Sequence, residues 1–257
     1  MTATTIPAQA ASAPARPGRL TLVTAGRVLS QLRADHRTVA LILVLPCLLL
    51  GLIAWMFDGT PVLDRFGPML VGLFPLIVMF LVTSVATLRE RQSGTLERLM
   101  TTPLGKGDFV AGYAIAFAVL ALVQALVVVG FATLVGMDVA GPLWLVIVVA
   151  LLNAVLGCCL GLAASALARS EFQAVQMMPA IIFPQLITCG LLMPRDQMPQ
   201  VLEWLSRVFP LTYAIEAMQT LAAGGEWADV RGAVGVIVLF IVGAVVLGVA
   251  TLRRRTP

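Results

Sequence analysis

Residues 66–88 read FGPMLVGLFPLIVMFLVTSVATL and contain no Asp, Glu, Lys or Arg. Residues 89–109 follow as RERQSGTLERLMTTPLGKGDF and hold seven charged residues, although the whole chain is only 12% charged and 60% hydrophobic. Soluble domains are about half apolar and about a quarter charged. Long charge-free runs separated by short polar blocks therefore predict an all-α membrane protein rather than a soluble domain.

Six windows of this kind are each long enough to cross a bilayer once, because a hydrocarbon core about 30 Å thick needs about 20 helical residues. The predicted spans cover about 38–57, 67–88, 110–135, 143–168, 172–193 and 232–252. Residues 1–18 are rich in Ala, Pro and Thr and predict a disordered tail. Residues 19–257 then form a single predicted membrane domain.

Basic residues set the predicted orientation of these six spans. An even number of spans places both termini on one side, and 13 of the 17 Lys and Arg residues fall in the segments on that side. The remaining four are Arg65, Arg195, Arg207 and Arg231. The positive-inside rule therefore predicts that both termini and the block at 89–109 are cytoplasmic. Because the basic residues flank spans in this way, we expect no nucleic-acid partner.

The predicted spans lack the residues that drive chemistry in most membrane enzymes and ion-coupled transporters. No Asp, Glu, His, Lys or Arg lies in the middle of a span, and HExxH and GxSxG motifs are absent. The four cysteines lie inside apolar runs, with a spacing that fits neither a zinc site nor a disulfide framework. The chain also has no GxxxxGK[ST] phosphate-binding loop. If the protein moves a molecule, the energy must come from another subunit.

Prolines and polar side chains occur inside several spans, including Pro46, Pro75, Gln124 and Asn153. The prolines predict kinks that neighbouring helices tolerate. The polar side chains form hydrogen bonds between helices or line a pathway, and the sequence leaves both interpretations open.

The polar block at 89–109 contains the pattern of a short amphipathic helix. Apolar side chains recur at helical spacing and charged ones lie off that stripe: Leu96, Leu99 and Met100, against Glu97 and Arg98. An isolated helix this short is marginal in water, so it needs support from its own domain or from a docked partner. A solvated basic loop is the alternative interpretation.

The lead-in before the first span predicts a second amphipathic helix. Leu22, Leu29 and Leu32 form an apolar stripe, and Arg27 and Arg33 lie off it. This pattern is typical of an interfacial helix that places its apolar side at the acyl boundary and its arginines at anionic headgroups. A basic flank that only sets topology is the alternative.

The segment between the fifth and sixth spans is too long for a turn and too apolar for a solvated loop. We predict two short helices, joined at Pro210, that dip into the outer leaflet. Trp204 and Tyr213 suit an interfacial aromatic belt. Glu203 and Glu216 are either solvent-facing residues or elements of an outer gate.

Two motifs give the chain a family resemblance. The first is Glu90…Gly94-Thr95-Leu96-Glu97-x-Leu99…Pro103, followed by Gly112. The second is Met193-Pro194…Met198-Pro199…Leu202…Leu205, followed by Pro210-Leu211-Thr212-Tyr213…Glu216. In this order and with six spans, they resemble the permease subunits of type-2 ABC exporters, especially the daunorubicin/doxorubicin-resistance branch. The resemblance covers nearly the whole chain after residue 18, which makes 19–257 an expected type-2 permease domain.

The resemblance implies roles for both motifs. It makes 94–100 the coupling helix that contacts an ATPase subunit, and the implied coupling residues are Glu90, Gly94, Thr95, Leu96, Glu97, Arg98, Leu99 and Met100. It makes 194–225 a re-entrant helical hairpin that caps the exit, and the implied hairpin residues are Pro194, Pro199, Trp204, Pro210, Tyr213 and Glu216. Phe209 and Gln219 depart from the family pattern, which often has Asn and Arg there. A gate argument based on that Arg does not carry over.

The resemblance also implies a function. We expect a non-catalytic permease subunit of an ATP-driven exporter that moves a hydrophobic or amphipathic compound, drug or lipid-like, out of the cytoplasm or inner leaflet. Its expected location is the bacterial inner membrane. Its expected partners are a separate ABC ATPase that binds ATP and Mg²⁺, a second or related permease, and the lipid bilayer, with no cofactor bound by this chain. A non-transporting membrane anchor or assembly subunit is the alternative.

Overall fold

The computed structural model describes residues 17–93 and 106–253, which form helices and connecting turns without strands. The predicted all-α class is therefore confirmed for these residues. The helices are α1 (Pro17–Ala34), α2 (His36–Met56), α3 (Val62–Gln92), α5 (Lys106–Leu134), α6 (Leu143–Leu167), α7 (Glu171–Thr188), η1 (Arg195–Gln197), α8 (Gln200–Ser206), α9 (Pro210–Ala222) and α10 (Trp227–Arg253). The predicted coupling segment at 94–100 lies outside the described residues.

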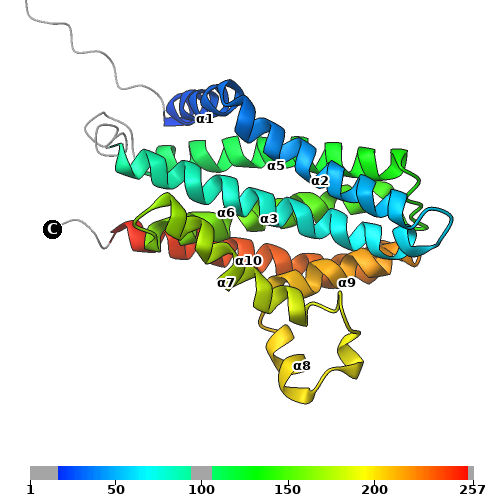
Figure 1. Ribbon diagram of the computed structural model, residues 1–257. Coiled ribbons are helices and arrows are strands. Elements are labelled where there is room, and N and C mark those ends of the chain that lie inside the picture. Colours follow the sequence, from blue (N-terminus) through cyan, green and yellow to red (C-terminus); the bar gives the residue numbers. More distant parts are fainter. Residues whose placement is uncertain (1–16, 94–105, 254–257) are drawn as a thin grey trace, which may run out of the picture.

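The long helices lie side by side in one bundle, and α8 projects from its flank (Figure 1). Within the described ranges, five helices are long and apolar enough to cross a membrane: α2, most of α3, most of α5, α6 and most of α10. The fifth predicted span corresponds to α7, which is not among these five. Its 18 residues include Glu171, three glutamines and two prolines, which make it less apolar than the membrane-spanning windows of those five helices.

Two glycines on α6 let its backbone meet the backbone of α3. A Cβ added at Gly157 would lie 2.3 Å from the carbonyl oxygen of Leu76, and one added at Gly161 would lie 2.5 Å from that of Phe80. Both pairs are offset by four residues, so the contact follows a stripe along the two helices. Small residues at four-residue spacing are typical of closely packed membrane helices, because close backbone approach increases van der Waals contact.

Buried amide side chains support neighbouring helices by donating to backbone carbonyls. The Nδ2 of Asn153 on α6 lies 2.6 Å from the carbonyl oxygen of Gly72 on α3, one turn before the glycine contact. The Nε2 of Gln124 on α5 lies 3.2 Å from the carbonyl oxygen of Ile42 on α2. Pro46 has no N–H to donate to that Ile42 oxygen, so Gln124 satisfies the acceptor that the proline frees. The sequence left two interpretations open for Gln124 and Asn153, namely hydrogen bonds between helices and the lining of a pathway. These contacts favour the hydrogen bonds.

The segment after α7 forms the short η1 and then two helices, α8 and α9, and α9 begins at the predicted break, Pro210. Helix α9 is largely buried, and Leu211, Ile215 and Met218 belong to the main hydrophobic core. At its far end, Gly141 donates its N–H to the carbonyl oxygen of Leu221 at 2.9 Å. Figure 1 shows α7 near the end of the bundle that holds α1, and α9 toward the opposite end.

The glycine stripe predicts a matched pair of outcomes. We expect Gly157→Ala to lower the free energy of unfolding by about 1–3 kcal/mol, because the new methyl group meets backbone that cannot move aside cheaply. Gly130→Ala on α5 meets nothing within 4 Å and should be neutral or stabilising by up to about 1 kcal/mol. Thermal unfolding of both variants in the same detergent measures this difference. Equal melting temperatures would show that the close contact does not stabilise the bundle.

Candidate functional site

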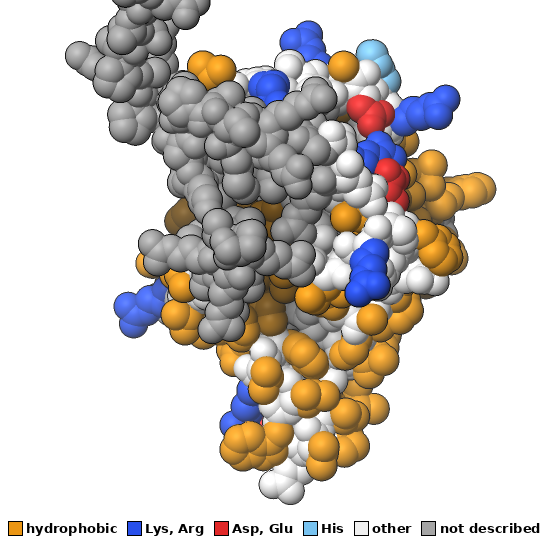
Figure 2. Space-filling view, turned by 90° about the vertical axis from the view of Figure 1, so that its left-hand side faces the viewer, with side chains coloured by type: hydrophobic (Ala, Val, Ile, Leu, Met, Phe, Trp, Pro, Cys, Tyr) orange, Lys and Arg blue, Asp and Glu red, His pale blue; other side chains and the backbone are white. Residues whose placement is uncertain are grey.

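Charged side chains gather at the end of the bundle where α1 meets α2 and where α3 ends. Figure 2 looks at this end and shows Lys/Arg and Asp/Glu side chains beside the only histidine, His36, with hydrophobic side chains on the flank. The predicted coupling segment follows α3 directly in the sequence. The last turn of α3 is therefore the closest described part of the chain to that segment in sequence.

Glu90 is the one predicted coupling residue that the structure describes. Its Oε1 lies 3.5 Å from the guanidinium of Arg27 on α1, and the same guanidinium nitrogen lies 3.4 Å from the hydroxyl of Tyr113 on α5. The ion pair is partly buried, with 33% of the Arg27 side chain and 18% of the Glu90 side chain exposed. Arg27 thereby joins the end of α3 to α1 and also contacts α5.

Arg89, which precedes Glu90 on α3, connects this helix to α7. Arg89 donates to both carboxylate oxygens of Glu171, the first residue of α7, at 2.8 and 3.0 Å. Gln92 adds a bond at 2.9 Å to the carbonyl oxygen of Arg169 in the turn between α6 and α7. We call these contacts the α3–α7 clamp. The two bonds from Arg89 lower the pKa of Glu171, so this carboxylate is ionised at neutral pH.

Sequence reasoning missed this clamp, although a signal for it exists. Arg89 ends one charge-free window, and Glu171 lies in the short polar segment RSE between two others. Residues that flank spans on the same side are confined to the same layer, so opposite charges there have a raised chance of pairing. The sequence does not show which of the neighbouring charges pair.

Asp35 sets the junction between α1 and α2. Its carboxylate accepts the N–H of Thr38 at 3.2 Å and the Thr38 hydroxyl at 2.6 Å, which caps the start of α2. The Thr38 hydroxyl contributes most to lowering the pKa of Asp35, followed by the Thr38 N–H, and the positive charge of Arg89 adds to it. The junction therefore carries a permanent negative charge at neutral pH.

The lead-in segment that was predicted to be an interfacial helix forms a helix, α1, and most of its apolar stripe contacts protein. Leu32 is buried and Leu29 packs at the edge of the cluster that joins α1 to α5, whereas Leu22 is 65% exposed. Arg33 is exposed, and Arg27 faces Glu90. Where α1 lies relative to a bilayer stays a prediction.

The predicted hairpin residues are distributed over η1, α8 and α9. Pro194 and Pro199 directly precede η1 and α8, Trp204 is exposed on α8, and Pro210 is the first residue of α9. Tyr213 donates its hydroxyl to the carbonyl oxygen of Arg207 at 2.9 Å. Glu216 accepts a bond from Arg195 at 3.0 Å, which ties η1 to α9. These contacts bring the hairpin elements together, while the gate role of Glu216 stays a prediction.

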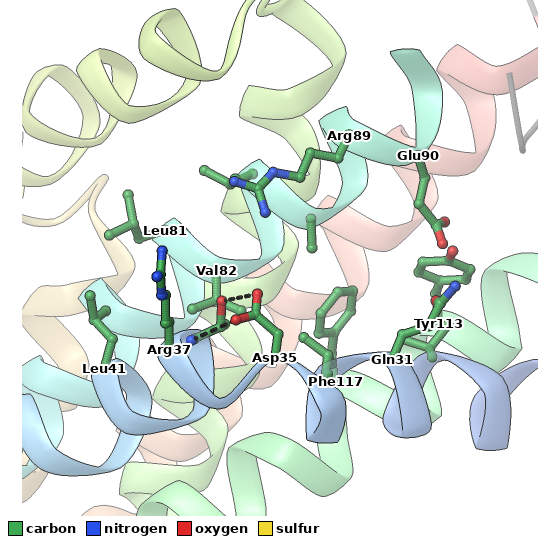
Figure 3. Close-up of a pocket in the computed structure, with 15 residues that line it drawn as sticks. Gln31, Asp35, Arg37, Leu41, Leu81, Val82, Arg89, Glu90, Tyr113 and Phe117 are labelled. Carbon is green, nitrogen blue, oxygen red and sulfur yellow. Dashed lines mark hydrogen bonds between the residues drawn. The ribbon is translucent and has the colours of Figure 1, made fainter. Parts of the chain in front are cut away.

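A cavity of about 460 Å³ lies beside the α1–α2 junction, between α1, α2, α3 and α5 (Figure 3). Its polar side chains include Asp35, Arg37 and Glu90, and its apolar ones include Leu41 and Phe117. The described residues contain no cluster of three or more side chains suited to bind a metal ion. This end of the bundle therefore combines paired charges with a cavity that has both polar and apolar lining residues.

Comparison with known proteins gives the chain a family. Residues 19–222 match the ABC-2 type transporter family, and this range includes most of the described helices. The chain is 27% identical over 201 residues to ABC transporter G family member 20 of Dictyostelium discoideum, an alignment that covers 75% of this chain and 27% of that protein.

Two bacterial relatives have names that include a permease. The chain is 23% identical over 193 residues to the probable multidrug ABC transporter permease YbhS of Escherichia coli K12, which covers 74% of this chain and 50% of that protein. It is 24% identical over 187 residues to the linearmycin resistance permease protein LnrN of Bacillus subtilis 168, covering 71% and 48%. The alignments thus span half or less of these relatives. Because the family match covers most of the sequence and five described helices are apolar enough to cross a membrane, the chain is a membrane protein that belongs to the ABC-2 type transporter family.

Proposed function

We propose that this chain is the permease subunit of an ATP-driven exporter of the daunorubicin/doxorubicin-resistance-like branch. It moves a hydrophobic or amphipathic compound out of the cytoplasm or inner leaflet, and a separate ABC ATPase binds and hydrolyses ATP with Mg²⁺. The observation that carries this proposal is the pair of connections at the end of α3, where Arg89 and Glu90 bind different helices next to the predicted coupling segment. Relatives named as multidrug and linearmycin resistance permeases support the class of cargo.

The proposal includes six crossings of the bacterial inner membrane with both termini in the cytoplasm. The charge bias of the sequence supports this orientation, and α1 and the last turns of α10 lie at the same end of the bundle (Figure 1). The fifth crossing is α7, whose 18 residues extend about 27 Å at about 1.5 Å per residue, close to the thickness of a hydrocarbon core. The buried α9 then re-enters from the outer side, and Arg195–Glu216 fixes the hairpin that caps the exit.

The α3–α7 clamp suggests how motion of the ATPase reaches this hairpin. A push on the coupling segment moves the end of α3, and the clamp transfers that movement to the first residue of α7. Helix α7 leads directly to η1, α8 and α9 along the chain. The Arg27–Glu90 pair transfers the same movement to α1. A second permease, identical or related, completes the pathway in this proposal.

The coupling assignment predicts the loss of transport without loss of membrane insertion. We expect Glu97→Ala, or deletion of residues 94–100, to abolish ATP-dependent doxorubicin uptake by inside-out vesicles that contain the permease and its ATPase. Transport-linked ATP hydrolysis should be lost as well. The exposed Glu226→Ala, in the turn between α9 and α10, is the matched control and should transport normally.

Unchanged uptake by the Glu97 variant and the deletion would contradict the coupling assignment. A different result would support a non-transporting membrane anchor. In that case the wild-type protein would assemble with the ATPase, but the vesicles would show no flux of doxorubicin or of a fluorescent phospholipid. Membrane extraction of each variant checks that the protein is inserted.

The clamp predicts that charge reversal uncouples the permease and that a double swap restores it. The Arg89 and Glu171 side chains are 58% and 43% exposed, so their pair contributes only about 0–1 kcal/mol to stability. Allosteric coupling energies are larger, about 1–3 kcal/mol, so we expect Arg89→Glu to reduce transport about tenfold while ATP hydrolysis continues. The double variant Arg89→Glu/Glu171→Arg should recover most transport.

Melting temperature separates this coupling role from a structural one, because it should change little in the Arg89→Glu, Glu171→Arg and double variants. Arg231→Glu reverses one exposed charge at the start of α10 that makes no ion pair among the described residues, and serves as the control. If the double swap transports no better than either single reversal, the clamp does not transmit the movement.

A further inference from the structure

The cavity beside the α1–α2 junction has two chemically different parts. One part is apolar and is lined by Leu41 of α2 and by Leu81, Val82 and Val85 of α3. The other is polar and is lined by Asp35, Arg89 and Glu90, and Arg37 lies beside the apolar part. Its volume of about 460 Å³ is that of a small-molecule site, since such sites occupy about 300–1,000 Å³. The two parts together match an amphiphile rather than a wholly polar or wholly apolar ligand.

Of the two arginines that line this cavity, Arg37 is the one without an ion pair among the described residues. Asp35, Arg89 and Glu90 already have the hydrogen-bonded or ion-paired partners described above. Arg37 is exposed and makes no ion pair among the described residues. A guanidinium presents parallel N–H donors that match the oxygens of a phosphate. Arg37 therefore offers an unpaired guanidinium to an anionic group of this kind.

The apolar part of the cavity continues onto the outer surface of α2. Leu41 lines the cavity and is also 41% exposed, and Val44, Leu45 and Leu48 extend the exposed apolar surface along the same helix. In a membrane-spanning helix such a surface faces acyl chains. Figure 3 shows Arg37 at the same end of the cavity as Leu41 and Leu81, with Glu90 and Tyr113 at the other end. A chain that starts beside Arg37 can thus leave along α2 into the bilayer.

We propose that this cavity binds one phospholipid of the bilayer, with its phosphate at Arg37 and the first part of one acyl chain between Leu41 and Leu81. The bound lipid joins the α1–α2 junction to α3 at the end where the predicted coupling segment begins. A free phosphate or nucleotide would leave the apolar part of the cavity unfilled. The site depends on the chain lying in a membrane and does not depend on export, so a failure of the proposed transport would leave it standing.

A photoactivatable phosphatidylethanolamine with a diazirine in one acyl chain tests this site in nanodiscs that contain the full-length protein. We expect labelled peptides from the part of α2 around Leu41 and the part of α3 around Leu81. Arg37→Gln should reduce this labelling at least fivefold. Leu81→Trp, which fills the cavity and keeps every charge, should reduce it as strongly.

Two comparisons make the test specific to the cavity. Arg33→Gln removes one exposed charge from the same end of the bundle without touching the cavity, and its labelling should match that of the wild type. Inorganic phosphate should not compete with the probe, because it lacks an acyl chain. Monodisperse gel filtration and unchanged melting show that each variant is folded.

Equal labelling of Arg37→Gln and the wild type would overturn the proposal. Equal losses in Arg33→Gln and Arg37→Gln would overturn it too, since they would indicate general attraction of lipid to a basic surface. Label spread evenly along α2 would show annular lipid in place of a bound one. Displacement of the probe by doxorubicin, but not by unlabelled phosphatidylethanolamine, would assign the cavity to cargo and likewise overturn the lipid site.

Discussion

The close contact between α6 and α3 determines where the other helices of the bundle can pack. Gly157 and Gly161 remove the side chains that would separate the two backbones, and Asn153 adds a hydrogen bond on the same stripe. In a bilayer, lipid tails are as apolar as the side chains, so helices associate through close packing and hydrogen bonds rather than through the exclusion of water. Glycine stripes are therefore a stronger constraint here than in a soluble bundle, where buried area dominates.

The rigid centre and the polar end of α3 differ in how easily their contacts can change. At Gly157 the backbones of α3 and α6 are in direct contact with no room for a Cβ, whereas a partly exposed ion pair contributes only about 0–1 kcal/mol. A conformational change that starts at this end therefore costs least if α3 moves with α6 as one unit and the ion pairs of Arg89 and Glu90 rearrange. We infer that the contacts of Arg89 and Glu90 determine which helices move together with α3.

Sequence patterns predicted the positions of individual helices better than the contacts between helices. Charge-free windows located the long helices because burial in lipid requires long uncharged segments, and Pro210 marked the start of α9 because proline favours the first turn. The pairing of Arg89 with Glu171, 82 residues away, depends on which helices become neighbours, and no local pattern encodes that. The apolar stripe of α1 was recognised, yet the sequence does not distinguish a stripe that faces lipid from one that faces α5. Residues 94–100 remain predictions.

The prolines within the spans account for part of the buried polar chemistry. Pro46 leaves the Ile42 carbonyl without a helical donor, and Gln124 supplies one from α5, so the two residues form a single structural unit. Asn153 likewise donates to backbone, at Gly72. Both amides are fully buried, which makes them poor candidates for contact with a passing molecule. In the proposed exporter, the residues that line the pathway are therefore better sought on the exposed faces of the bundle, where a second permease would pack, than along the interior of a single chain.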